Sequence, residues 1–275
     1  MNASLKTRVL TAVIGVPLII LMLLSPTPVI AVLVTAASLI ALYEYFKAVG
    51  ICGKKVLCIL GYVASLVISL GSVFTASVSL ILVYAYMLIL FVTMLSSKGS
   101  IKAQDIYKLI FGLVYIPYFM SHIIYIRTLD FGNFYVWLVF LGAFMTDSAA
   151  YFAGTFLGKH KLCPSISPKK TIEGAIGGVL GGGLSFVLYG IIVNSFFTQA
   201  LDGKSINIVL IFVLGLMVSV VSQIGDLVAS YIKREYEIKD YGNLFPGHGG
   251  MLDRCDSIIL VAPIIFLFLS NISII

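Results

Sequence analysis

The chain has 275 residues, of which 60% are hydrophobic and only 11% are charged, and its formal net charge is +6. Because a soluble domain usually carries about 25% charged residues, this composition excludes a water-soluble fold of this size. It predicts an all-α, polytopic integral membrane protein, and no nucleic-acid partner is expected.

Nine apolar segments follow one another along the chain, each close to the roughly 20 residues that a spanning helix needs. The first follows Lys6 and Arg8, as in a signal peptide, but no small-x-small cleavage pattern comes after it, so we predict a retained span. The break between the third and fourth segments, at 74–77, is only a faint turn. The predicted spans are 9–25, 28–46, 56–73, 76–95, 106–126, 133–153, 174–197, 206–229 and 256–275.

The basic residues test this layout. With nine spans, the N-terminus and the even-numbered loops share one side of the membrane and hold all of the 18 basic residues except Arg127 and Lys204. The positive-inside rule makes that side the cytoplasm. We therefore predict a single membrane domain over 1–275. Its N-terminal helices occupy 1–140, and a catalytic half occupies 141–275, with cytoplasmic loops at 154–173 and 230–255.

Three acidic residues lie within predicted spans and two more lie at the entry to the last one, and a charge inside lipid costs about 2.5–3.5 kcal/mol on insertion scales. Glu44 suggests no role. Asp147 and Asp226 lie near the cytoplasmic ends of their spans, and Asp253 and Asp256 open the last span from the same side. Four carboxylates would repel one another, and Mg²⁺, which prefers hard oxygen ligands, would relieve that repulsion. The alternative for each aspartate is a lysine partner or a helix cap.

Two predicted spans carry stripes at helical spacing. One is a polar stripe on 206–229, formed by Ser219, Ser222, Gln223, Asp226 and Ser230. The other is a glycine stripe on 174–197, formed by Gly174, Gly178 and Gly182. The glycine stripe predicts close packing between helices, of the small-xxx-small kind, in preference to ligand binding.

Two loops carry the basic residues that anionic substrates need. In the first, Lys169, Lys170 and Thr171 lead into the span at 174–197, and a helix N-terminus attracts anions. An ordinary positive-inside loop is the alternative there, and we prefer it for Lys159 and Lys161.

The second loop reads SYIKREYEIKDYGNLFPGHGGMLDRCD over residues 230–256. The proline and three glycines around His248 predict sharp turns and a close backbone approach to a ligand. Donors suited to phosphate surround them at Lys233, Arg234, Lys239 and Arg254.

On these residues the chain resembles the phosphatidate cytidylyltransferases, also called CDP-diacylglycerol synthases. Their signature is S-x-apolar-K-R-x4-K-D-x-small-x2-apolar-P-x-H-G-G-x2-D-R-x-D. Cys255 stands where the family usually has an apolar residue. The resemblance extends more loosely to Asp147, 167–174 and 223–226, and the first 140 residues share little beyond hydrophobicity. The signature is met by Ser230, Ile232, Lys233, Arg234, Lys239, Asp240, Gly242, Phe245, Pro246, His248, Gly249, Gly250, Asp253, Arg254 and Asp256.

The resemblance implies a reaction in phospholipid biosynthesis in which CTP and phosphatidate give CDP-diacylglycerol and pyrophosphate, with Mg²⁺ required. It also implies a homodimer in a bacterial plasma membrane, with the active site facing the cytoplasm. We expect Asp226 and Asp253, supported by Asp147 and Asp256, to be catalytic and to hold one or two cations. Substrate binding is expected from Lys169, Lys170, Thr171, Glu173, Lys233, Arg234, Lys239, Asp240, His248, Gly249, Gly250 and Arg254.

Competing hypotheses come from three classes of protein, of which a non-catalytic lipid-binding scaffold is disfavoured and would show no dependence on Mg²⁺ or CTP. Another CTP-dependent lipid enzyme, such as a polyprenol- or phytol-kinase-like protein or a CDP-archaeol synthase, would share the polar loop and use a different acceptor. CDP-alcohol phosphotransferases are excluded, because their DGxxAR…GxxxDxxxD pattern does not occur. An ion-coupled transporter is disfavoured, since no internal repeat is visible and the acids lie at one membrane face.

Overall fold

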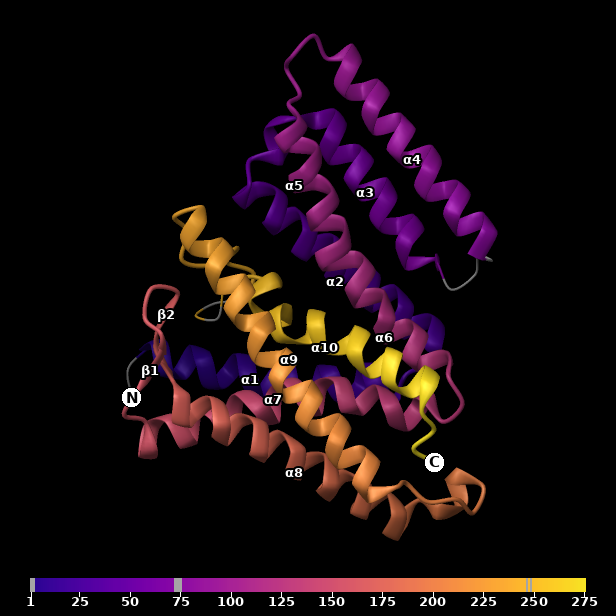
Figure 1. Cartoon of the computed structure of the whole chain (residues 1–275), viewed down its shortest axis with the longest axis vertical. Helices are drawn as coiled ribbons and strands as arrows, with labels where there is room; N and C mark the ends of the chain where they lie inside the picture. Colours follow the sequence, from indigo (N-terminus) through magenta and orange to yellow (C-terminus); the bar gives the residue numbers. More distant parts are fainter. Residues whose placement is uncertain (1–2, 72–75, 246, 248) are drawn as a thin grey trace. The chain divides into compact units, whose positions relative to one another are not determined.

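The computed structural model describes every residue except 1–2, 72–75, 246 and 248, and the described chain consists of helices, one short hairpin and the loops that join them (Figure 1). The chain forms two compact units. Unit 1 comprises Met1–Ile124 and Ile238–Arg254, and unit 2 comprises Tyr125–Glu237 and Cys255–Ile275. The predicted all-α membrane class is confirmed, whereas the prediction of a single domain stays a prediction.

Unit 1 is built from helices in chain order, joined by short turns. Their buried residues are mostly apolar, with Glu44 on α2 as a charged exception. Pro28 in the first turn of α2 is well placed, because a helix start needs no N–H at that position. The elements are α1 (Ala3–Leu24), α2 (Thr27–Ala48), the 3₁₀ turn η1 (Ile51–Gly53), α3 (Lys55–Ser69), α4 (Ala76–Ser96), α5 (Ala103–Leu113), η3 (Val114–Tyr118) and α6 (Phe119–Thr128), of which the last crosses into unit 2.

The segment 103–128 is one helical run with a π-helical turn at η3. Pro117 lies in that turn and has no N–H to give to the preceding turn. A π-turn is one of the ways in which a helix accommodates such a break, so the predicted span at 106–126 continues through the proline.

Unit 2 holds three long helices and the hairpin. The helices α7 and α8 pack along each other, as do α8 and α9. The elements are α7 (Gly132–Leu157), β1 (Lys161–Cys163), β2 (Ser167–Thr171), α8 (Ile172–Phe196), η4 (Thr198–Leu201), α9 (Ile208–Glu235) and most of α10 (Leu252–Asn271).

The glycine stripe on α8 allows this packing, and the predicted role for it is confirmed. A Cβ atom at Gly178 would lie 2.9 Å from the Cβ of Ala150 on α7. A Cβ atom at Gly182 would overlap the hydroxyl of Ser219 on α9. The backbones therefore approach more closely than any larger residue would permit.

Two predicted loops differ in detail from the observed structure. The loop 154–173 contains the antiparallel hairpin of β1 and β2, in which Lys161 pairs with Thr171 and Cys163 pairs with Ser167. The loop 230–255 begins as a helix, because α9 continues to Glu235. Strands of three and five residues are too short to show a two-residue period, so the pattern could not predict them.

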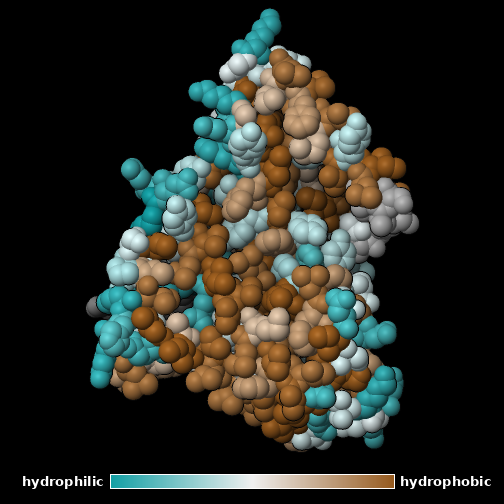
Figure 2. Space-filling model, viewed as in Figure 1, coloured by the Kyte–Doolittle hydropathy of each residue, from teal (hydrophilic) through white to brown (hydrophobic). Residues whose placement is uncertain are grey.

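Five described helical runs are long and apolar enough to cross a membrane, and every predicted span overlaps a helix. Shorter apolar stretches lie in α1 (Gly15–Leu24), α3 (Lys55–Ser69) and α4 (Leu80–Ser96). In Figure 2, brown covers the length of α8 and α9, and teal atoms gather near the helix ends. A soluble protein would bury such faces, so these sides fit hydrocarbon. The count of nine spans stays a prediction.

Candidate functional site

Lys170 and Asp226 form the central ion pair of unit 2. The Lys170 Nζ atom on β2 lies 2.7 Å from Asp226 Oδ2 on α9. Ser230, one helical turn further on, places its hydroxyl 3.4 Å from Asp226 Oδ1. The side chains of Lys170 and Asp226 remain 26% and 31% exposed, so they stay within reach of a ligand.

Gly225 brings α9 against α10 beside this pair. A Cβ atom at Gly225 would lie only 2.6 Å from the carbonyl oxygen of Asp256. The Asp256 carboxylate lies within Coulombic range of Asp226, Asp147 and Lys233. The structure thus brings three of the four predicted aspartates into one neighbourhood of unit 2.

These aspartates have the donor chemistry that Mg²⁺ prefers, namely carboxylate oxygens with room for water. Throughout the described part of the chain, no group of three or more His, Cys, Asp or Glu side chains is close enough together to hold a metal ion. The ammonium of Lys170 already lies beside Asp226, which shows that this carboxylate accommodates a positive charge. The carboxylates suit the predicted cation by their donor chemistry alone, and metal binding by them stays a prediction.

The start of α8 uses two predicted substrate-binding residues in local contacts. Thr171 is the N-cap, and its hydroxyl accepts the Gly174 N–H at 3.1 Å. The Glu173 carboxylate accepts the backbone N–H of Lys159 at 3.1 Å and contacts His160 Nδ1 at 2.6 Å. Both residues therefore make local contacts where the hairpin meets the helix, and binding of substrate by either stays a prediction.

The end of α9 carries Lys233 and Arg234 next to the hairpin. Arg234 Nε donates to the carbonyl oxygen of Ile166 in the hairpin turn, at 3.4 Å. Lys169 on β2 is exposed. Basic side chains from β2 and from the last turn of α9 thus belong to one end of unit 2, as anionic substrates would require.

The polar stripe on α9 divides into two parts. Ser219 is fully buried and receives a hydrogen bond of 2.9 Å from the Thr146 hydroxyl on α7. Gln223 Nε2 donates to the Ala175 carbonyl oxygen on α8 at 3.1 Å. This deeper part joins helices together, and the outer part, Asp226 and Ser230, carries the exposed charge.

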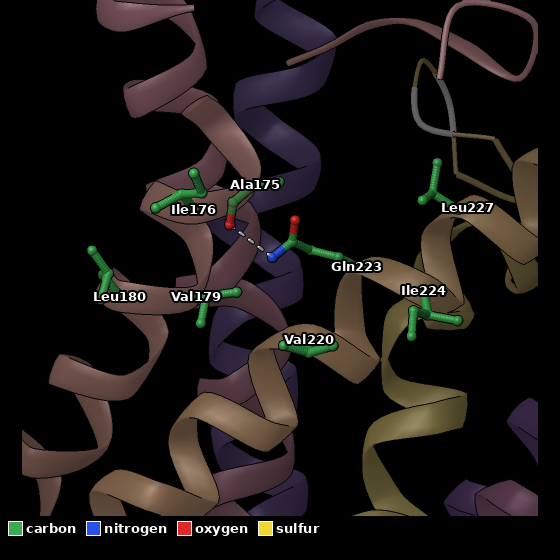
Figure 3. A pocket seen from close by; sticks show the side chains of 8 residues that line it. All are labelled: Ala175, Ile176, Val179, Leu180, Val220, Gln223, Ile224 and Leu227. Carbon is green, nitrogen blue, oxygen red and sulfur yellow. Dashed lines mark hydrogen bonds between the residues drawn. The ribbon is translucent and has the colours of Figure 1, made fainter. Parts of the chain in front are cut away.

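A cavity of about 370 Å³ lies between α8 and α9, and Figure 3 shows side chains from both helices around it. Its wall is apolar except for Gln223, whose amide is held by Ala175. Asp226 lies between the lining residues Ile224 and Leu227 in the sequence of α9, so the ion pair of Lys170 and Asp226 adjoins the apolar cavity. The lining residues are Ala175, Ile176, Val179, Leu180, Val220, Gln223, Ile224 and Leu227.

The signature loop, 238–254, belongs to unit 1. Asp253 is 6% exposed, and its Oδ2 atom accepts the N–H groups of Tyr241 at 2.8 Å and Gly250 at 3.0 Å. The φ angles are +76° at Gly247 and +83° at Gly249, values that favour glycine. The predicted sharp turns are confirmed.

Glu44 on α2, for which sequence analysis predicts no role, contacts this loop. It is 5% exposed, and its two carboxylate oxygens accept the N–H groups of Met251 at 3.0 Å and Leu252 at 2.8 Å. A Cβ atom at Gly250 would overlap this carboxylate. The expected close approach at Gly250 is therefore made to Glu44.

The remaining predicted residues lie on the same loop. Lys239, Asp240 and Arg254 are exposed in unit 1, and His248 lies outside the described residues. The predicted site residues are thus divided between the two units, and those outside the following list belong to unit 1. Unit 2 holds Asp147, Lys169, Lys170, Thr171, Glu173, Asp226, Lys233, Arg234 and Asp256.

Comparison with known proteins gives a consistent family. The sequence model of the cytidylyltransferase family matches residues 6–272. A phosphatidate cytidylyltransferase of Bacillus subtilis (strain 168) is 33% identical over an alignment of 277 positions, which covers 97% of this chain and 98% of that protein. The enzyme of that name from Staphylococcus haemolyticus (strain JCSC1435) is 32% identical over 268 residues, covering 96% and 99%.

A further phosphatidate cytidylyltransferase, from Rickettsia bellii (strain RML369-C), is 38% identical over 190 residues, covering 67% of this chain and 79% of that protein. The similarity therefore includes the helices of both units as well as the signature loop. The chain belongs to the cytidylyltransferase family.

Proposed function

We propose that the protein transfers the cytidylyl group of CTP to phosphatidate, giving CDP-diacylglycerol and pyrophosphate. The observation that carries this proposal is the full signature from Ser230 to Asp256, in a chain that aligns over nearly its whole length with relatives named phosphatidate cytidylyltransferase. The apolar helices support a lipid substrate, because they would keep the enzyme where that lipid resides.

The reaction needs little covalent help from the protein. An oxygen of the lipid phosphate attacks the α-phosphorus of CTP, the bond from that phosphorus to the bridging oxygen breaks, and pyrophosphate leaves. A phosphate monoester has a second pKa of about 6, so the nucleophile is largely deprotonated at neutral pH. Catalysis then consists mainly of positioning and charge neutralisation. We therefore give His248 a role in binding phosphate or orienting the loop.

The basic residues are proposed to hold the phosphates. Lys170 is placed beside Asp226, and Arg234 is tied to the hairpin turn, so both start from fixed positions. Mg²⁺ held by Asp226 and Asp253, with Asp147 and Asp256 in support, would supply further positive charge to the CTP phosphates. The phosphate-binding set is Lys169, Lys170, Lys233, Arg234, Lys239 and Arg254.

The setting of the enzyme is part of the proposal. We place it in the plasma (inner) membrane of a bacterium, with its active site facing the cytoplasm where CTP is made, and we propose a homodimer. The bacterial relatives and the apolar helices support this setting.

The test is incubation of detergent-purified protein with radiolabelled CTP, phosphatidate and Mg²⁺, with label followed into the lipid phase and EDTA as a control. Labelled CDP-diacylglycerol that requires the metal is expected. If the protein binds CTP and labels an isoprenoid alcohol but not phosphatidate, the acceptor is different and the proposal is wrong.

The same assay tests Asp226. We expect Asp226→Asn to lower turnover by at least about 100-fold, because its carboxylate interacts with cationic groups in the reacting complex. Asp130→Asn, at an exposed carboxylate predicted on the opposite membrane side, is the matched control and should keep full activity. Near-normal turnover in a folded Asp226→Asn protein would refute the role in catalysis and in cation binding.

A further inference from the structure

A carboxylate from α2 reaches the backbone at the start of α10. Glu44 accepts two consecutive N–H groups, from Met251 and Leu252, and the Glu44 side chain is almost fully buried. The first N–H groups of a helix have no partner within the helix, and they carry its positive partial charge. The buried Glu44 carboxylate therefore gives these N–H groups an acceptor and interacts favourably with the positive end of the helix dipole.

Three successive backbone N–H groups are divided between two carboxylates. Asp253 takes that of Gly250, and Glu44 takes those of Met251 and Leu252. Without Glu44, the latter two groups would be buried donors without their acceptor, a state that is costly. Asp253 lies on the same turn and already accepts the neighbouring Gly250 N–H, so its carboxylate could shift to these donors if Glu44 were absent. Glu44 therefore keeps Asp253 in its present bonds to Tyr241 and Gly250.

The loop is shaped around this side chain. Cβ atoms at Gly242 and at Gly250 would each overlap the Glu44 carboxylate. Neither glycine has a positive φ angle, so glycine is required there for space and not for backbone conformation. Two separate stretches of the signature loop, at Gly242 and at Gly250, thus pack directly against the Glu44 carboxylate.

We infer that Glu44 is a positioning residue for the nucleotidyl transfer: it fixes the backbone at residues 250–252 and so holds Asp253 and Arg254 in place. This inference rests on the proposed function for its effect on turnover, and on the geometry alone for its effect on the loop. Glu44 itself touches no substrate in this role.

The experiment compares Glu44→Gln with Asp105→Asn in the purified full-length protein. Asp105 is a matched control in the same unit, because its carboxylate also accepts a backbone N–H, from Lys102 at 2.7 Å, and pairs with Lys54. Amide hydrogen exchange is measured by mass spectrometry, and kcat and KM for CTP are measured separately. Glu44→Asp is the second variant, since it keeps the charge and is one methylene shorter.

In Glu44→Gln we expect exchange over 241–252 to rise at least about tenfold, as the loss of a hydrogen bond to a charged group predicts. The kcat value should fall at least tenfold, and Glu44→Asp should recover part of it. Asp105→Asn should leave both the loop exchange and kcat unchanged, even if its unfolding temperature falls.

Unchanged exchange at 241–252 in Glu44→Gln would overturn the inference, as would a loss of kcat no larger than that of Asp105→Asn. If Glu44→Gln does not fold, the same criteria apply to Glu44→Asp. Absence of transfer to phosphatidate in the unaltered protein would instead defeat the proposed function, and the exchange result would still decide the role of Glu44 in the loop.

Discussion

The ion pair between Lys170 and Asp226 is more important for charge balance than for stability. Pairs that are as exposed as this one contribute about 0–1 kcal/mol to folding. Around it, however, Asp147 and Asp256 add negative charge, and Asp256 interacts with both Asp226 and Asp147. Lys170 is therefore a counter-charge for a group of carboxylates that would otherwise repel one another.

We predict that Lys170→Met lowers kcat/KM for CTP at least about tenfold, because it removes a counter-charge from the carboxylates and a donor from the phosphates. The free energy of unfolding should change by no more than about 1 kcal/mol. The measurements are the lipid-phase assay and thermal unfolding in detergent.

Lys161→Met, at an exposed lysine of the same hairpin, is its control. Equal losses of kcat/KM in Lys161→Met and Lys170→Met would show that the hairpin acts only through its overall charge.

Single residues also show where prediction from sequence stops. Asp226 was recognised because a carboxylate inside an apolar segment is unusual, and Thr171 because it precedes a helix. The partners of Glu44 lie 207 and 208 residues further along the chain, so no local pattern could reveal them. An acidic residue in an apolar span marks Glu44 as unusual, but the sequence does not indicate what its carboxylate contacts.

At the scale of elements, α8 depends on its glycines for its contacts with α7 and α9. Helices in a membrane gain no hydrophobic free energy by associating, so close van der Waals packing between small residues has to supply it. The deep hydroxyls of Thr146 and Ser219 then join α7 and α9 at the level of Gly182. One added methyl group would separate these three helices.

We therefore predict that Gly182→Ala destabilises the protein by about 1–3 kcal/mol, since it overpacks a close contact. Gly15→Ala is the matched control, because a Cβ placed there meets no atom within 4 Å from the described residues beyond its own helical turns, and alanine favours the helix. Thermal unfolding in one detergent would compare the two. An unfolding temperature of Gly182→Ala equal to or above that of Gly15→Ala would contradict the packing argument.

The helices were predictable and the connections were not, for a physical reason. Each long helix carries about 20 apolar residues, a signal that a few polar residues do not hide. The hairpin at Lys161–Thr171 depends on pairing between two very short strands, and the π-turn at Pro117 depends on how its neighbours relax. Neither leaves a periodic trace in the sequence.

At the scale of the whole molecule, the distribution of basic residues predicts which loops face the cytoplasm. Lys98 and Lys239 fall on the predicted cytoplasmic side and Lys204 on the other. We expect cysteines introduced at positions 98 and 239, in a protein whose four native cysteines are replaced by serine, to react with a membrane-impermeant maleimide only in inside-out vesicles.

A cysteine at position 204 should react in intact cells. Reaction of positions 204 and 239 from the same side would disprove the predicted number of crossings between them.

The long sequence separation between Glu44 and its partners has a consequence for how the protein is made. At about 5–20 residues per second, a ribosome needs roughly 10 to 40 s to proceed from α2 to the start of α10. During that interval α2 enters the membrane with an acid whose two backbone partners do not yet exist. This unit therefore cannot finish folding in the order of synthesis, because Glu44 of α2 gains its hydrogen-bond donors only when residues 251 and 252 have been made.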